Sequence, residues 1–183
     1  MAASSFPCWK YDVFLCFRDE VRKNFLSHLC WALDDNGFRA CKDDELERGF
    51  DIATELQQAI EQSRIAVVVF SKNFADSEWC LDELVKILDC RQRLGQIVLP
   101  IFFHVDPSDV RNQSGNFGHA FTRHKEVPLE IVKKWKNGLT YAANLTGFDL
   151  QHVNGDESEL IKKIIEELHK KLPVKTPLPK SRL

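Results

Sequence analysis

The sequence predicts an α/β fold in which a parallel β-sheet is covered by helices on both faces. Short, almost wholly apolar runs, typical of strands buried on both faces, alternate along the chain with segments of amphipathic helical spacing. This alternation favours right-handed βαβ crossovers and a doubly wound sheet. Folds of this kind place their ligand sites at the carboxyl ends of the strands.

Apolar spacing and capping residues assign the elements in order. Residues 64–70 (RIAVVVF), rich in β-branched side chains, form the clearest strand, and Asp76 or Ser77 caps the helix after it. The predicted order is strand 11–17, helix 22–36, strand 38–42, helix 51–62, strand 64–70, helix 78–93, strand 96–103, helix 130–144, strand 145–150 and helix 157–171.

Three parts of the chain fall outside this regular pattern. Pro100 lies inside strand 96–103, where its missing N–H argues against a regular central strand. The polar stretch 106–118 is interpreted as a loop. Residues 1–9 are predicted to be a flexible segment and residues 172–183 a proline-containing tail, which leaves one domain at 10–171.

The composition narrows the class of protein. A formal net charge of −2 gives no general attraction to nucleic acid or to an anionic membrane. No apolar stretch approaches the roughly 20 residues of a membrane helix, and the first ten residues contain no export signal. We therefore expect a cytoplasmic protein, with the nucleus left open as a second compartment.

The six cysteines give no sign of a metal site or of disulfides. None of them forms a C-x-x-C pair, so a zinc site is not expected. Cys16, Cys80 and Cys90 lie in apolar runs and are interpreted as small core residues. Neither a metal nor a cofactor is predicted.

Most nucleotide-binding and catalytic signatures are absent. Arg18–Arg22, after the first strand, lacks the G-x-G-x-x-G and Walker A patterns, and the chain has no G-x-S-x-G elbow. Asp12 with Asp43 and Asp44 leaves open a phospho-acceptor fold of the response-regulator kind. The plainer interpretation of the Asp43-Asp44-Glu45 cluster is a solvated turn.

The most informative stretch is SEWCLDEL, residues 77–84. Trp79 and Glu83 are four residues apart, so they share one face of the predicted helix near its first turn. A carboxylate beside an aromatic side chain can hold a ribose or a stacked base. Spacing alone favours a plainer interpretation, in which Trp79 packs and Glu83 is an exposed acid favoured by the helix dipole.

Several motifs resemble the plant Toll/interleukin-1 receptor-like (TIR) domain family. They are YDVFLCFR at 11–18, DDELERG at 43–49, RIAVVVFSKNFADSEWCLDEL at 64–84 and IVLPIFFHVDPSDVR at 97–111, followed by NLTGFDL and NGDESELIKKIIEEL. The resemblance covers residues 10–170 in order. It implies a flavodoxin-like TIR fold, with a five-stranded parallel sheet and helices on both faces.

The resemblance also implies an activity, the cleavage of NAD+ or NADP+ as substrate. The family's catalytic glutamate lies in the W-C-L-x-E-L motif, which assigns the catalytic role to Glu83. Trp79 and Ser77 would line the substrate pocket. Phe17 and Arg18 of the first loop and Arg48 of the second would be further neighbours, and the products would be nicotinamide with ADP-ribose-type or cyclic nucleotide signals.

A second implication concerns self-association, which involves the first and last helices. Ser27-His28 is similar to the Ser-His pair of a symmetric helix-to-helix contact in plant TIR domains, and Trp31 lies on the same face as His28. A large aromatic side chain on a polar face suits an interface. The implied partners are further copies of this chain and other TIR domains, and a neighbouring copy is expected to help order loop 43–50.

Both loops beside the implied pocket depart from the family pattern. The usual F-R-G-E-D-T-R stretch is one residue shorter at 17–22 and lacks its glycine, and the loop at 43–50 is also shortened. Losing a glycine removes a residue that adopts positive φ easily. The alternative hypothesis is therefore a weakly active or inactive TIR adaptor that works through TIR–TIR contacts.

Overall fold

The computed structural model describes residues 9–42 and 52–172, and among them five parallel strands form one sheet. The strand order is β2-β1-β3-β4-β5, which is the flavodoxin-like order, so the predicted fold class is confirmed. The strands are β1 (Tyr11–Cys16), β2 (Ala40–Lys42), β3 (Ser63–Phe70), β4 (Ile97–Phe102) and β5 (Phe148–Asp149).

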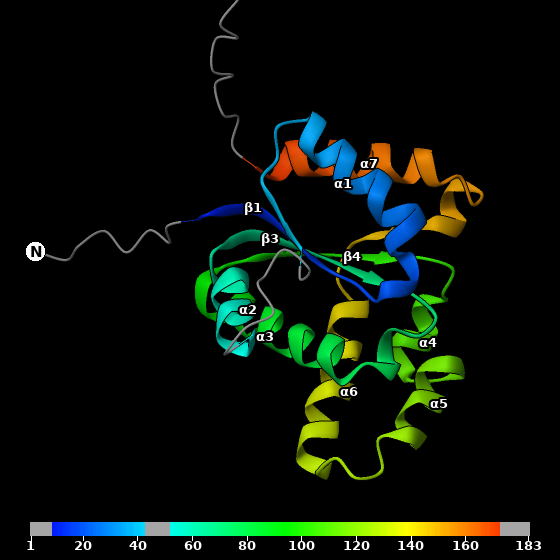
Figure 1. Cartoon of the computed structure of the whole chain (residues 1–183). Helices are drawn as coiled ribbons and strands as arrows, with labels where there is room; N and C mark the ends of the chain where they lie inside the picture. Colours follow the sequence, from blue (N-terminus) through cyan, green and yellow to red (C-terminus); the bar gives the residue numbers. More distant parts are fainter. Residues whose placement is uncertain (1–8, 43–51, 173–183) are drawn as a thin grey trace, which may run out of the picture.

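Helices cover both faces of the sheet, as Figure 1 shows. α1 and α7 lie side by side on one face, and the other helices lie on the opposite face. The helices are α1 (Ser27–Asp35), α2 (Ile52–Glu61), α3 (Glu78–Leu94), α4 (Pro107–Asn112), α5 (Gly115–Arg123), α6 (Leu129–Ala143) and α7 (Glu157–Lys171). None of them is both long and apolar enough to cross a bilayer within the described residues.

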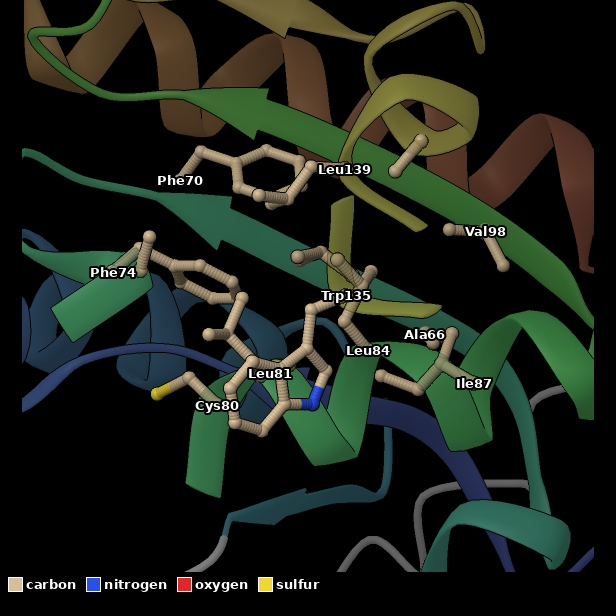
Figure 2. Packing of buried hydrophobic residues seen from close by; sticks show 14 of the residues in the cluster. Ala66, Phe70, Phe74, Cys80, Leu81, Leu84, Ile87, Val98, Trp135 and Leu139 are labelled. Carbon is tan, nitrogen blue, oxygen red and sulfur yellow. The ribbon is translucent and has the colours of Figure 1, made fainter. Parts of the chain in front are cut away.

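Each face of the sheet has its own apolar core because successive strand residues point to opposite faces. In β3, Ala66, Val68 and Phe70 face the α3 side, while Val67 and Val69 face the α1 side. Figure 2 shows the first of these cores, where side chains of β3, α3 and α6 meet. The first of these cores, which contains Leu81, Leu84 and Ile87, holds α3 against the sheet.

The predicted loop at 106–118 is wrong, because α4 and α5 occupy most of it. Asp106 caps α4 by accepting a hydrogen bond from the Ser108 N–H at 2.8 Å, and Pro107 occupies the first turn, where no N–H is needed. Gly115, at φ +56°, begins α5 against the Asp109 side chain. The Asp-Pro-Ser sequence is a helix-start signal that the loop interpretation overlooked.

Pro100 lies in an internal strand, contrary to the expectation that it would argue against one. It pairs with Val68 of β3 on one side. On the other side, the ladder with β5 involves only Ile101 and Phe102, which come after Pro100. Gly147 approaches closely here, since an added Cβ would stand 2.0 Å from the Pro100 carbonyl oxygen. The short β5 therefore leaves room for a proline in β4.

Smaller differences concern element ends. The predicted helix 22–36 begins with a π-helical turn, Arg22–Leu26, before α1. β2 and β5 are shorter than predicted, and a 3-10 turn, Leu150–Val153, follows β5. Cys16, Cys80 and Cys90 are buried, as predicted for core residues. The segments 1–8, 43–51 and 173–183 lie outside the described residues, so the predictions made for them stay predictions.

The connections define where a ligand is expected. From β1 the chain passes to β2, and from β3 it passes to β4, so the strand order reverses between β1 and β3. Open α/β sheets bind ligands outside the carboxyl ends of strands at such a point. The loops after β1 and β3, and the start of α3, meet there.

Candidate active site

A pocket of about 630 Å³ opens between α2 and α3 and collects Trp79 and Glu83 on one wall. The two side chains lie one turn apart on α3, as their spacing predicted. The lining residues are Leu56, Gln57 and Ile60 of α2, Trp79, Asp82, Glu83, Val85, Lys86 and Asp89 of α3, and Lys134 of α6. Much of this lining is apolar, with charged groups among it, which is typical of small-molecule sites.

The capping of α3 fixes the place of its first turns. A 3-10 turn, Phe74–Asp76, brings the chain from β3 to Ser77, which has an extended backbone and is the N-cap. The Ser77 Oγ accepts a hydrogen bond from the Cys80 N–H at 3.2 Å. Asp76, the other predicted cap, instead pairs with Arg123 at 2.9 Å. The Ser77 hydroxyl is therefore engaged by the helix itself.

Glu83 is buried, with only 3% of its surface exposed. The interpretation of Glu83 as an exposed helix-start acid is therefore wrong. Trp79 is 39% exposed and lines the same pocket with its apolar side chain. Burying an ionisable group costs free energy. Such groups are often found in functional sites, so a buried acid that lines a pocket is a candidate for function.

The first loop reaches α3 through its backbone. The Cys80 Sγ donates to the Phe17 carbonyl oxygen at 3.3 Å. Glu20 accepts from the Asn73 N–H at 2.9 Å and from the Asn73 side-chain amide at 2.6 Å. These contacts join the loop after β1 to the loop after β3, at the reversal in strand order.

The other side chains that were predicted to line the pocket lie elsewhere in the described structure. Phe17 is 8% exposed and packs into the core on the α1 side, and neither it nor Arg18 or Ser77 is among the described residues that line the pocket. The shorter loop needs no glycine, since none of residues 17–22 has a positive φ. Arg48 lies outside the described residues.

Polar contacts hold the groups around the pocket. The Trp135 Nε1 of α6 donates to Asp82 Oδ1 at 2.9 Å, and Lys86 Nζ donates to Glu61 Oε1 at 2.6 Å. These links tie α6 and α2 to α3. Burial raises the pKa of the Cys90 thiol farther along α3, which keeps that thiol protonated and unreactive.

A second cavity, of about 620 Å³, lies at the ends of β4 and β5. Its carboxylates are engaged by nearby groups: Asp106 accepts from Ser108, and Asp149 Oδ1 accepts from the Gln151 N–H at 2.9 Å. The hydrogen bonds from Ser108 lower the pKa of Asp106. Because these groups serve as caps, the α2–α3 pocket is the stronger candidate for a reaction site.

The phospho-acceptor hypothesis loses support at Asp12, while its other aspartates, Asp43 and Asp44, lie outside the described residues. Asp12 lies at the amino end of β1 and accepts a hydrogen bond from the Arg39 N–H at 2.8 Å, so it is far along the strand from the ligand edge expected for a phospho-acceptor. Across 9–42 and 52–172, no three His, Cys, Asp or Glu side chains gather as metal ligands.

The predicted self-association residues lie on the outer face of α1. Ser27, His28 and Trp31 are all exposed, and Trp31 has 70% of its surface accessible. The Ser27 Oγ donates to the Asn24 carbonyl oxygen at 2.9 Å, which stabilises the change from the π-helical turn to α1. α7 lies beside α1 (Figure 1), and the His169 ring nitrogen Nε2 is 3.3 Å from Asn36 Oδ1.

Comparison with known proteins gives consistent matches. The family model for the TIR domain matches residues 10–182. The disease resistance protein RPV1 of Vitis rotundifolia is 51% identical over 168 residues, which is 90% of this chain and 12% of the relative. The TMV resistance protein N of Nicotiana glutinosa is 45% identical over 93% of this chain and 15% of its own length. The chain thus spans a small part of the length of these relatives.

Solved structures give the same picture. The TIR domains of the activated Roq1 resistosome, which directly recognises the pathogen effector XopQ, are 47% identical with a TM-score of 0.82, and the match covers 87% of this chain and 99% of theirs. The RPS4 and RRS1 TIR domain heterodimer is 22% identical with a TM-score of 0.56, over 87% of this chain and 96% of the other. The second likeness shows the shared fold alone.

Proposed function

Because this chain belongs to the TIR domain family, we propose that it is a plant immune-signalling NAD(P)+ glycohydrolase whose activity depends on self-association. Its relatives include proteins named for disease resistance. The reaction breaks the bond between nicotinamide and the adjoining ribose. Nicotinamide and ADP-ribose-type or cyclic nucleotide signals are the products.

The observation that supports this proposal best is the placement of Glu83. Glu83 is buried and lines a pocket of about 630 Å³ together with Trp79. An aromatic surface and an acidic acceptor one helical turn apart suit a ligand with a flat base joined to a ribose. In a site shielded from water, hydrogen bonds to the carboxylate are stronger than in bulk solvent.

The chemistry requires no metal and no dedicated acid. Nicotinamide departs as a neutral pyridine, taking both electrons of the glycosidic bond, and leaves positive charge on the ribose. Glu83 stabilises this oxocarbenium-like state by accepting hydrogen bonds from ribose hydroxyls, each worth about 1.5–3 kcal/mol because the acceptor is charged. Water, or a hydroxyl of a nucleotide, then adds to the ribose carbon and releases a proton.

The test measures nicotinamide release from NAD+ by concentrated, purified protein. Glu83→Gln keeps the size of the side chain and removes its charge, so release should fall at least about 100-fold. Glu78→Gln is the matched control, because Glu78 is exposed on the first turn of the same helix and does not line the pocket. Equal release by Glu83→Gln and the unchanged protein would remove Glu83 from the mechanism.

The second candidate function is an adaptor that works through contacts between TIR domains. It is favoured by the exposed His28 and Trp31 on α1, and the similar Roq1 TIR domains belong to a resistosome assembly. The same surface serves the enzyme, since self-association is part of the first proposal. The isologous use of α1 and α7 would give a dimer.

The two candidate functions differ in whether nicotinamide release depends on assembly and on Glu83. If the chain is an enzyme that requires assembly, specific activity rises with protein concentration, and His28→Ala lowers both assembly and nicotinamide release. If it is an adaptor, assembly depends on His28 while no release depends on Glu83. Self-association that is unchanged by His28→Ala would exclude this face of α1 from either role.

A further inference from the structure

The pocket continues along α3 well beyond Glu83. Residues 79, 82, 83, 86 and 89 all line it, so α3 contributes from Trp79 to Asp89, about 15 Å along the helix. Cleavage at the nicotinamide ribose uses only the first turns. The remaining groove has an apolar α2 wall, formed by Leu56 and Ile60, and a charged rim.

Lys134 contributes to this rim from a distant part of the sequence. The next residue, Trp135, donates its indole N–H to Asp82 at 2.9 Å, which joins this part of α6 to α3. Asp82 is three residues after Trp79 on the helix and adjacent to Glu83. Lys134 and Glu83 line the same pocket of about 630 Å³.

The charges around the groove leave Lys134 available to an anion. Lys86 is paired with Glu61 at 2.6 Å, and Asp89 is paired with Arg93 at 2.8 Å. The Asp82 carboxylate accepts from Trp135, which reduces its repulsion toward a second anion. Lys134 is exposed and forms no ion pair with any residue in the described ranges.

We propose that Lys134 binds the diphosphate of the nucleotide whose ribose lies at Glu83. This inference rests on the proposed function and assigns its next contact. The diphosphate of NAD+ is attached to the 5′ carbon of the nicotinamide ribose, so it begins a few bonds from the carbon that reacts. An ammonium group with three donors suits phosphate oxygens, and the apolar groove beyond it accepts the rest of the ligand.

A different ligand chemistry would use the same groove without Lys134. A phosphate-free nucleoside or another flat apolar molecule would contact Trp79 and the α2 wall alone. The apolar share of the lining permits this, but Lys134, which has no ion pair among the described residues, favours the phosphate-bearing ligand. The test therefore compares ligands with and without phosphate.

The experiment measures binding of ADP-ribose and of adenosine to the unchanged protein, Lys134→Glu and Lys133→Glu. Lys133 is the matched control, because it is exposed on the same helix and does not line the groove. Lys134→Glu should raise the dissociation constant of ADP-ribose about tenfold at low salt, and Lys133→Glu less than twofold. Adenosine should bind all three proteins alike.

Kinetics add a readout that a purely structural role would not produce. If NAD+ is cleaved, Lys134→Glu should raise its KM with little change in kcat, because Lys134 binds away from the reacting carbon. Equal weakening by both lysine changes, unchanged ADP-ribose binding in Lys134→Glu, or no ADP-ribose binding by the unchanged protein would overturn the proposal. Nicotinamide release in Glu83→Gln tests the glycohydrolase separately, so the two failures are distinguishable.

Discussion

The α2–α3 groove and the outer face of α1 lie on opposite sides of the sheet, and their candidate side chains differ sharply in exposure. The groove encloses a carboxylate, Glu83, with 3% of its surface exposed, whereas α1 presents an indole, Trp31, with 70% exposed. In each place the residue is found where its type is uncommon. The buried acid and the exposed tryptophan are therefore the two residues that the proposals rest on.

The shapes differ as well. The groove is concave and lined from α2, α3 and α6, which suits a small ligand that is surrounded on several sides. The α1 face is the outer surface of a helix beside α7 (Figure 1), which suits a protein surface of similar shape. The two proposed sites, one for reaction and one for assembly, thus lie on opposite sides of one sheet.

The largest expected effect is on the free energy of unfolding, and it distinguishes Trp135 from Trp31. Trp135→Ala removes a side chain 2% exposed and its hydrogen bond to Asp82, so the free energy of unfolding should fall by about 3–5 kcal/mol. Trp31→Ala should change it by less than about 0.5 kcal/mol, since Trp31 is mostly exposed. Urea unfolding followed by circular dichroism measures both, and similar losses would contradict the contrast between the two faces.

The next effect concerns assembly. Trp31→Ala should weaken self-association at least tenfold, because aromatic side chains at the centre of an interface contribute strongly to binding. Sedimentation velocity over a concentration series measures the change. Tyr141→Ala is the control, since Tyr141 is an exposed aromatic residue on α6. If both changes weaken assembly equally, α1 is not the specific surface.

A smaller effect distinguishes the two roles of Ser77. Ser77→Ala removes the cap of α3 and should lower the free energy of unfolding by about 1 kcal/mol. Ser77→Asn keeps a capping side chain and should restore most of this stability. If nicotinamide release also recovers in Ser77→Asn, Ser77 acts by positioning α3; if release stays low, the hydroxyl contacts substrate directly.

The smallest expected effect is a pH dependence of stability. It distinguishes the Asp156 cap of α7 from the Ser77 cap of α3. Hydrogen bonds from the Ser158 hydroxyl and from the N–H groups of Glu159 and Ser158 lower the pKa of Asp156 below its ordinary value of 3.8. A lowered folded-state pKa gives stability that is present above pH 3.8 and is lost as pH falls through the folded value. Ser77, the cap of α3, has a hydroxyl that does not ionise in this pH range, so its contribution to stability does not change there.

Unfolding midpoints at pH 7 and pH 3 test this difference. Asp156→Asn should lose less stability between the two pH values than the unchanged protein, because the amide does not titrate. Ser77→Ala should leave the pH dependence as it was. An Asp156→Asn protein with the original pH dependence would show that other carboxylates account for the acid sensitivity.

Much of the fold was predictable because local patterns determine it. The apolar run RIAVVVF became β3, buried on both faces, and the helical spacing after it became α3 with Ser77 at its cap. The prediction of a loop at 106–118 was wrong because the two helices there are short. The polar composition of the stretch outweighed the helix-start signal of Asp106-Pro107 in that interpretation. Pro100 was misleading because its tolerance depends on how far β5 extends beside it.

The site was predictable only in part. The i, i+4 spacing placed Trp79 and Glu83 on one face, and the resemblance to TIR domains assigned their roles, which remain proposals. Spacing did not show whether Glu83 is buried, because burial depends on the residues packed around α3. The total charge of −2 said nothing of Lys134, whose place beside the groove depends on the contact between Trp135 and Asp82.

By itself the sequence determined the layered α/β fold, the position of α3 after β3 and the outward face of α1, since each follows from periodicity within one segment. The tertiary structure alone decided the depth of Glu83, the meeting of the first and third loops through Glu20 and Asn73, and the approach of α6 to the groove. The physical reason is that periodicity reports which side of an element faces inward, whereas a pocket forms where several elements meet.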